Sequence, residues 1–173
     1  MRVFIAIDLP ENVREEIRKI QEKLPEFQGK LTEKENIHLT LKFLGEIESI
    51  DLINRKLGLI KFRKFKIRID KIGVFSENFV RIVWLGVDSK CKELWGLQKE
   101  IDSKLKDLFV EERRFMGHIT IARVKGLDKN RFLSKLKDIK VDIGFEVENF
   151  KLKKSVLTAE KPVYEDILKV DLV

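Results

Sequence analysis

Cysteine and histidine are scarce in this chain of 173 residues, which holds one cysteine, Cys91, and two histidines. A single cysteine cannot form an internal disulfide, and so few thiolate and imidazole ligands do not fit the usual structural zinc sites. We interpret Cys91 as a small core or boundary residue on a helix. We therefore predict a protein of the reducing cytoplasm that uses no metal and no cofactor.

Long apolar runs are also missing, because no stretch approaches the roughly 18 residues that a membrane-spanning helix needs. The apolar start, Met1–Asp8, is too short to read as a signal peptide. Proline and glycine are sparse, at 3 and 9 residues, and no linker or low-complexity segment divides the chain. We expect a single domain over residues 1–173 that does not bind a membrane, and we expect it to be a monomer.

Charge is abundant and unequal in sign, since 36 Lys and Arg residues against 29 Asp and Glu residues give a formal net charge of +7. Basic residues cluster at 61–66, at 113–114 and at 151–154. Each cluster by itself is typical of a solvated face. Together they favour an anionic partner such as RNA or a nucleotide, without identifying it.

Hydrophobic periodicity predicts strands and helices that alternate irregularly and are joined by short connections. The predicted strands cover residues 3–8, 37–44, 65–75, 79–87, 118–124, 141–150, 153–158 and 166–172, with a turn at 76–78. The first predicted helix begins at Pro10, and two others span 50–60 and 130–136. A further helix, the longest, follows an N-cap at Asp88 or Ser89. This mixture favours an α+β fold over a doubly wound parallel sheet.

Both histidines stand in the same short pattern, His38-Leu39-Thr40-Leu41 and His118-Ile119-Thr120-Ile121. A strand alternates its side chains between two faces, so each histidine shares a face with the threonine two residues on. One such pattern alone is typical of a structural histidine. The use of both histidines in matching patterns instead indicates a shared site.

The two patterns lie 118 − 38 = 80 residues apart, close to half of the chain. Each follows a helix and precedes another helix. We therefore predict a duplicated unit of strand, helix, motif strand and helix, which would give two lobes related by a pseudo-two-fold axis. The hypothesis requires residues 1–87 to superpose on residues 88–173.

Two imidazoles that face one substrate can act as an acid–base pair, because histidine gains and loses a proton near neutral pH. One imidazole takes a proton from an attacking water or hydroxyl, and the other gives a proton to the departing oxygen. The hydroxyls of Thr40 and Thr120 would donate hydrogen bonds to the anionic oxygens between them. Cleavage of a phosphodiester, above all of a 2′,3′-cyclic phosphate, fits this division of labour without a metal.

Arg123 follows the second pattern and would supply a fixed positive charge for a phosphate. Strict alternation places Arg123 on the face away from His118 and Thr120, so it reaches the site only from a strand end or a β-bulge. By the same alternation we predict that Phe43 is a core residue. Trp84 and Phe115 are further candidates for base stacking, but we interpret Trp84, like Trp95, as core.

The sequence resembles the 2H phosphoesterases, and within them the RNA 2′,3′-cyclic phosphodiesterases, also called 2′-5′ RNA ligases. The likeness covers nearly the whole chain. It rests on the opening segment 2–10, the first motif at 36–45, the second motif at 117–125, and segments 83–87 and 163–165. The family's second motif usually follows a proline, where this chain has Gly117.

The resemblance implies a bilobal α+β fold in which two mainly antiparallel sheets line a central basic cleft, with helices on the outside. By position, it implies that His38 is the general acid for the leaving 3′ oxygen and His118 the general base that activates water. It implies that Thr40, Thr120 and Arg123 bind the phosphate. The implied substrate is RNA with a 2′,3′-cyclic phosphate end, tRNA halves among the sources, and the implied product is a 2′-phosphate.

Three alternatives stay open at this point. The chain could bind RNA ends or nucleotides without useful turnover. It could cleave another substrate, such as a cyclic nucleotide, an ADP-ribose cyclic phosphate or a 2′-5′ oligoadenylate. It could also join RNA ends, because ligation differs from hydrolysis only in which hydroxyl attacks the same phosphorus.

Overall fold

The structure is a computed structural model that describes residues 1–76 and 78–173. Within these residues the chain forms four α-helices and nine strands, which are arranged in two antiparallel sheets. This confirms the predicted α+β class. The predicted turn at 76–78 includes Glu77 and so lies partly outside the described residues.

The first sheet, here called sheet A, has the strand order β3-β1-β8-β9, and every neighbouring pair is antiparallel. Its strands are β1 (Arg2–Asp8), β3 (His38–Glu46), β8 (Asn149–Leu157) and β9 (Pro162–Asp171). β1 lies between β3 and β8 inside the sheet, and its side chains from Val3 to Ile7 are all buried. Sheet A carries the first histidine motif on β3.

The second sheet, sheet B, has the order β2-β6-β5-β4-β7, and its neighbouring strands are also antiparallel. Its strands are β2 (Gln28–Leu31), β4 (Phe65–Phe75), β5 (Ile82–Val87), β6 (His118–Gly126) and β7 (Ile143–Val147). β6 carries the second motif. The two motif strands, β3 and β6, contact each other where the sheets meet.

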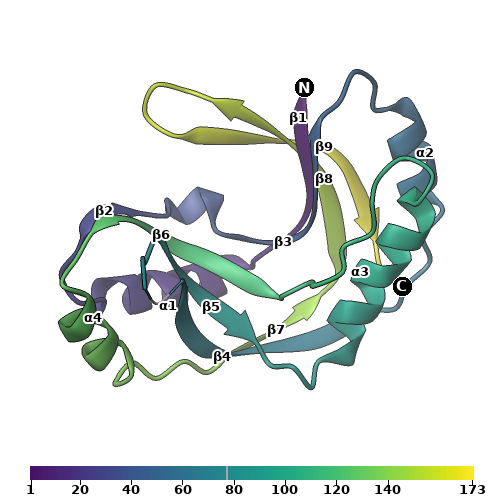
Figure 1. Cartoon of the computed structure of the whole chain (residues 1–173). Helices are drawn as coiled ribbons and strands as arrows, with labels where there is room; N and C mark the ends of the chain where they lie inside the picture. The colour runs from purple at the N-terminus through teal and green to yellow at the C-terminus, as the bar shows by residue number, and fades with distance from the viewer. Residues whose placement is uncertain (77) are drawn as a thin grey trace.

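The helices lie on the outside, as predicted (Figure 1). They are α1 (Glu11–Glu22), α2 (Asp51–Gly58), α3 (Lys92–Leu105) and α4 (Lys129–Leu136), with a short 3-10 helix η1 at Lys34–Asn36. α1 follows β1 of sheet A but contacts β6 and β7 of sheet B. α3 follows β5 of sheet B but lies beside α2, which contacts β9 of sheet A. None of the helices in the described residues is long and apolar enough to cross a membrane.

Several predicted boundaries were wrong for local reasons. The longest helix begins at Lys92 with Cys91 as its N-cap. Asp88 is instead used in the preceding turn, where its side chain accepts from the Lys90 N–H and its carbonyl accepts from the Cys91 N–H. β2 was missed because all four of its residues are exposed and show no apolar alternation.

The order of elements repeats with an offset close to 80 residues. Adding 80 moves β3 (38–46) onto 118–126, the range of β6, and moves β1 (2–8) onto 82–88, against 82–87 for β5. The same shift moves α1 onto 91–102 and α2 onto 131–138, against 92–105 for α3 and 129–136 for α4. The order strand, helix, motif strand and helix thus occurs twice, but the second copy begins with β5 at Ile82 and not after residue 87. That the two lobes superpose stays a prediction.

A buried ion pair fastens α3 to the first motif strand. Lys42 on β3 donates to an Asp102 carboxylate oxygen at 2.5 Å and to the carbonyl of Val110 at 2.7 Å. The side chains of Lys42 and Asp102 are only 4% and 7% exposed. The second carboxylate oxygen accepts from Gln98 Nε2 and from the Glu112 N–H, both at 2.9 Å. Burial by itself would raise the pKa of Asp102, but Lys42 and these donors outweigh it and lower the pKa.

We predict that Asp102→Asn lowers the free energy of unfolding by about 3 kcal/mol, because it leaves the Lys42 charge buried and unpaired. The matched control is Asp107→Asn, since the Asp107 side chain is 70% exposed in its pair with Lys56 and should change stability by less than about 0.5 kcal/mol. Denaturant unfolding measures both. Because the folded-state pKa of Asp102 is lowered, its contribution is fully present above the ordinary carboxyl pKa and is lost as pH falls through the folded value. Equal effects of the two substitutions would contradict the assignment.

Candidate active site

The five residues singled out in the sequence line one cleft of about 560 Å³. His38 and Thr40 come from β3, and His118, Thr120 and Arg123 come from β6. The lining also includes Arg2, Phe4, Lys30, Asn36, Phe43 and Tyr164. We call this space the histidine cleft. Its size suits one nucleotide rather than a large ligand.

Arg123 reaches the cleft because a β-bulge interrupts the alternation of β6. Trp84 of β5 pairs with Thr120, but the next pair joins Val83 to Ala122, so Ile121 is an extra residue. Ile121 and Ala122 are consecutive and both fully buried, and Arg123 is exposed. The extra residue returns Arg123 to the face of His118 and Thr120, which is the condition that the sequence had set.

The first motif strand contains the same irregularity, and it overturns the prediction for Phe43. Ala6 of β1 pairs with Thr40, whereas Ile5 pairs with Lys42, so Leu41 is the extra residue. Leu41 and Lys42 therefore both point inward, and Phe43 returns to the histidine face. Phe43 is 70% exposed and lines the cleft, at the position 80 residues before Arg123.

Hydrogen bonds from α1 and from the residue that follows β2 hold the bulge of β6. The carbonyl of Ile121 accepts from Gln21 Nε2 at 2.9 Å and from the Thr32 N–H at 2.9 Å. Gln21 also donates to the carbonyl of Thr32 at 2.9 Å. A buried polar group without a partner is costly, so these donors stabilise the carbonyl of the extra residue.

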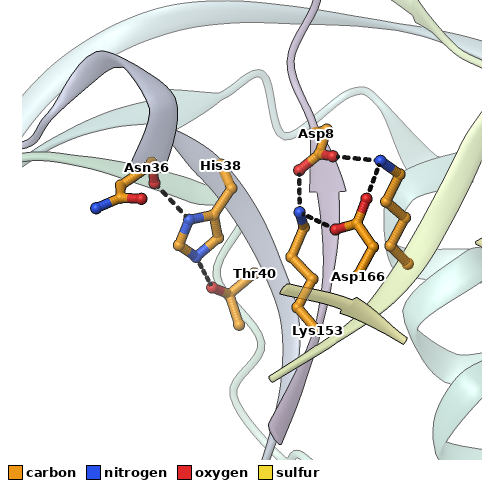
Figure 2. A network of polar contacts seen from close by, with 7 residues as sticks. Asp8, Asn36, His38, Thr40, Lys153 and Asp166 are labelled. Carbon is orange, nitrogen blue, oxygen red and sulfur yellow. Dashed lines mark hydrogen bonds and ion pairs between the residues drawn. The ribbon is translucent and has the colours of Figure 1, made fainter. Parts of the chain in front are cut away.

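The imidazole of His38 is held at both nitrogens, as Figure 2 shows. Its Nδ1 lies 2.7 Å from the carbonyl oxygen of Asn36, and its Nε2 lies 2.9 Å from the Thr40 hydroxyl. A carbonyl only accepts, so Nδ1 carries a proton and donates it to Asn36. In the neutral ring Nε2 is then an acceptor for the Thr40 hydroxyl.

His118 repeats this arrangement. Its Nδ1 lies 2.9 Å from the carbonyl oxygen of Met116, also two residues earlier in the chain. Nδ1 is therefore the donor in both rings, and Nε2 is the atom that either histidine offers to a substrate.

Aromatic side chains enclose the two imidazoles differently. The His38 ring lies 5.0 Å from the ring of Phe4 and 5.3 Å from that of Tyr164, between centroids. The His118 ring lies 5.0 Å from the ring of Phe75, which in turn contacts Trp84 at 5.6 Å. Trp84 pairs with Thr120 across the sheet, so it shares the histidine face instead of the core position predicted for it.

Burial lowers the pKa of His38 below its ordinary value. The positive charges of Lys153 and His118 act in the same direction, whereas the Asn36 carbonyl and Asp8 raise the pKa and only partly compensate. His38 is therefore neutral near pH 7 in the free protein. A bound anion beside the ring would favour the imidazolium and raise this pKa again.

The charges around the cleft are not those that the basic clusters had indicated. Lys151 and Lys153 form ion pairs with Asp8 and Asp166 on sheet A. The cations that line the cleft are Arg2, Lys30, Arg123 and Lys161, of which Lys161 pairs with Glu35. Sequence reasoning missed Arg2 and Lys30. The described residues show no group of three or more His, Cys, Asp or Glu side chains that could hold a metal ion.

Comparison with known proteins gives one consistent family. The family model described as LigT like phosphoesterase matches the chain twice, over residues 7–84 and 85–164. An RNA 2′,3′-cyclic phosphodiesterase of Methanocaldococcus jannaschii is 43% identical over 175 residues, covering 96% of this chain and 98% of its own length. The protein of the same name from Archaeoglobus fulgidus is 37% identical, with the same coverage of 96% and 98%.

Solved structures share the fold. The crystal structure of TT0787 of Thermus thermophilus has a TM-score of 0.81 and 28% identity, covering 99% of this chain and 97% of the other. The crystal structure of Escherichia coli LigT complexed with 3′-AMP has a TM-score of 0.79 and 26% identity, covering 99% and 97%. These likenesses cover nearly the whole chain and so include both sheets.

The bulge in β3 makes a prediction about stability. Leu41→Ala removes a fully buried side chain and should lower the free energy of unfolding by about 3 kcal/mol. Phe43→Ala removes a larger side chain that is 70% exposed and should change it by less than about 0.5 kcal/mol. Urea unfolding of the two variants tests the assignment. A larger loss from Phe43→Ala would mean that regular alternation holds and the bulge is absent.

Proposed function

The chain belongs to the LigT like phosphoesterase family, and we propose that it hydrolyses the 2′,3′-cyclic phosphate end of RNA to a 2′-phosphate. The observation that carries the proposal is the meeting of two His-x-Thr pairs, from β3 and β6, in one cleft. Relatives that match nearly the whole chain bear the name RNA 2′,3′-cyclic phosphodiesterase, which supports the choice of substrate.

In the proposed reaction, water attacks the phosphorus while Nε2 of His118 takes its proton. The bond between phosphorus and the 3′ oxygen breaks, and Nε2 of His38 gives that oxygen a proton. One proton is taken and one is given, so the pair of histidines ends with exchanged protonation states and resets through solvent. The Nδ1 contacts with Asn36 and Met116 support this assignment, because they leave Nε2 as the reacting atom in both rings.

The non-bridging phosphate oxygens would accept hydrogen bonds from Thr40, Thr120 and Arg123. Thr40 already donates to His38 in the free protein, so a substrate would take over this hydroxyl as it enters. The lowered pKa of His38 means that its role as general acid depends on the substrate, whose negative charge stabilises the imidazolium. An anionic substrate thus favours the uptake of a proton from solvent by the acid catalyst.

The cleft has two similar halves, so the orientation of the substrate decides which histidine is acid and which is base. Phe43 and Arg123 occupy matching positions but differ in chemistry. We propose that Arg123 binds the phosphate while the exposed ring of Phe43 stacks on the base, which fixes one orientation. A substrate bound the opposite way would exchange the two roles.

Ligation is the second candidate. A 5′-hydroxyl that replaces water at the phosphorus would displace the same 3′ oxygen and form a 2′-5′ linkage. Phe43 at the cleft is 70% exposed, so a second RNA end could approach the phosphorus from that side. Binding without turnover and cleavage of a non-RNA cyclic phosphate are the outcomes that the experiments below separate. That tRNA halves supply the substrate, and that the protein is cytoplasmic and monomeric, stay predictions.

We predict that a short RNA with a 2′,3′-cyclic phosphate end is converted to a 2′-phosphate in the presence of EDTA. His38→Ala and His118→Ala should each reduce kcat by roughly 10²- to 10⁴-fold, because each removes one proton-transfer step. The position of the phosphate is measured by nuclease digestion and mass spectrometry. Thermal unfolding of each variant controls for loss of structure.

Each outcome identifies one of the alternatives. A folded wild-type protein that binds the RNA end without product is a binding module. Product from a 2′,3′-cyclic mononucleotide or a 2′-5′ oligoadenylate, but not from RNA, moves the activity to a non-RNA substrate. Activity retained by either histidine variant refutes the paired acid–base mechanism.

Arg123→Gln should reduce kcat/KM for the same RNA by about 100-fold, because it removes a charged donor to the phosphate. Lys125→Gln is the matched control, since Lys125 lies on the same strand but does not line the cleft. This control should leave kcat/KM within about twofold. Similar losses in both variants would mean that Arg123 acts only through the general positive charge of the protein.

A further inference from the structure

Four charged side chains form a closed ring on the cleft side of sheet A (Figure 2). Lys151 lies 2.8 Å from Asp8 and 2.6 Å from Asp166, and Lys153 lies 2.9 Å from Asp8 and 2.7 Å from Asp166. Positive and negative groups alternate around the ring, so each charge has two opposite neighbours. The ring takes one member from β1, two from β8 and one from β9.

The ring lies beside His38. Asp8 and His38 are directly paired across β1 and β3, and paired residues of an antiparallel sheet project from the same face. Phe4, which contacts the His38 ring, is paired with Lys153 across β1 and β8. Tyr164, the other aromatic contact of His38, is two residues from Asp166 on the same face of β9.

The ring is partly withdrawn from solvent, so its charges are weakly screened. The exposed fraction is 9% for the Lys153 side chain, 20% for Lys151, 23% for Asp8 and 45% for Asp166. Burial by itself raises the pKa of the Asp8 and Asp166 carboxyls. Hydrogen bonds and positive charge from the two lysines outweigh burial, so both pKa values lie below the ordinary value. The two carboxylates and the two ammonium groups of the ring sum to a net charge of zero.

We propose that this ring is a positioning element for His38: it fixes the strands that carry the aromatic contacts of His38 and presents a balanced charge to the imidazole. The balance of charge matters because two members of the ring, Asp8 and Lys153, each act on the imidazole of His38. Lys153 lowers the pKa of His38 and Asp8 raises it, so the two partly cancel. The inference rests on the proposed function only in assigning a catalytic use to His38.

The groups that face His38 come from every neighbouring strand. They are Asp8 on β1, Lys153 on β8, Tyr164 on β9 and His118 on β6. Of these groups, only Asp8 and Lys153 are members of the ring. Asp166 and Lys151, the other two members, form ion pairs with them. Removing one acidic member leaves the ring with a net positive charge, and removing one lysine leaves it with a net negative charge.

The opposite charges predict opposite shifts. Asp166→Asn leaves both lysines facing one carboxylate, so the imidazolium is disfavoured and the pKa of His38 should fall by about half a pH unit. Lys153→Met leaves two carboxylates facing one ammonium, so the pKa of His38 should rise by about the same amount. The double variant Lys153→Met/Asp166→Asn restores the balance and should return the pKa close to that of the wild type.

The measurement is an imidazole NMR titration of the free protein. The chain has two histidines, so two ring signals appear, and the His118→Ala variant assigns them. This titration needs no turnover and therefore separates failure of this proposal from failure of the proposed function. In the active enzyme, the limb of the kcat/KM profile that His38 controls should move in the same direction as its pKa.

The matched controls are Glu165→Gln and Lys154→Met, which change the same charges one position along β9 and β8. Glu165 and Lys154 are paired with each other and alternate with the ring residues, so they project from the other face of sheet A. They should move the pKa of His38 by less than about 0.2 units. Shifts of the same sign in both ring variants, no shift in either, or equal shifts in the controls would overturn the proposal.

Discussion

Successive side chains of a strand point to opposite faces of the sheet. One extra residue, a β-bulge, moves every later side chain of that strand to the opposite face. Leu41 in β3 and Ile121 in β6 are such additions. They turn Phe43 and Arg123 toward the histidines, and they turn Lys42 and Ala122 inward. Without the two bulges the cleft would hold histidines and threonines but neither the guanidinium nor the exposed aromatic ring.

The bulges persist because elements from the opposite half of the chain hold them. α1, which follows β1, reaches β6 and satisfies the carbonyl of Ile121 through Gln21. α3, which follows β5, reaches β3 and pairs Asp102 with the inward-turned Lys42. A buried lysine on a motif strand is tolerated only with such a partner. A helix from each half of the chain therefore stabilises the bulge in the other half. The geometry of the cleft thus depends on the packing of the whole molecule.

The two histidines have the same local geometry and different surroundings. Each donates Nδ1–H to the carbonyl two residues earlier, a contact set by the chain itself. His38 then lies between Phe4 and Tyr164 next to a ring of four charges, whereas His118 lies against Phe75. A symmetric pair of motifs thus stands in an asymmetric cleft, and this difference gives the proposed acid and base separate environments.

The sequence alone predicted the α+β class, placed each histidine on one strand face with the threonine two residues on, and showed two matching motifs 80 residues apart. These features depend on short-range periodicity and on the matching of two motifs. Alternation alone misassigned Phe43 and left Arg123 undecided, because a bulge shows only in the register between neighbouring strands. Tertiary structure also decided that Lys151 and Lys153 are neutralised by Asp8 as well as by Asp166. Asp166 is 13 and 15 positions from the lysines on the next strand, but Asp8 lies about 145 positions away and meets them only in the folded sheet.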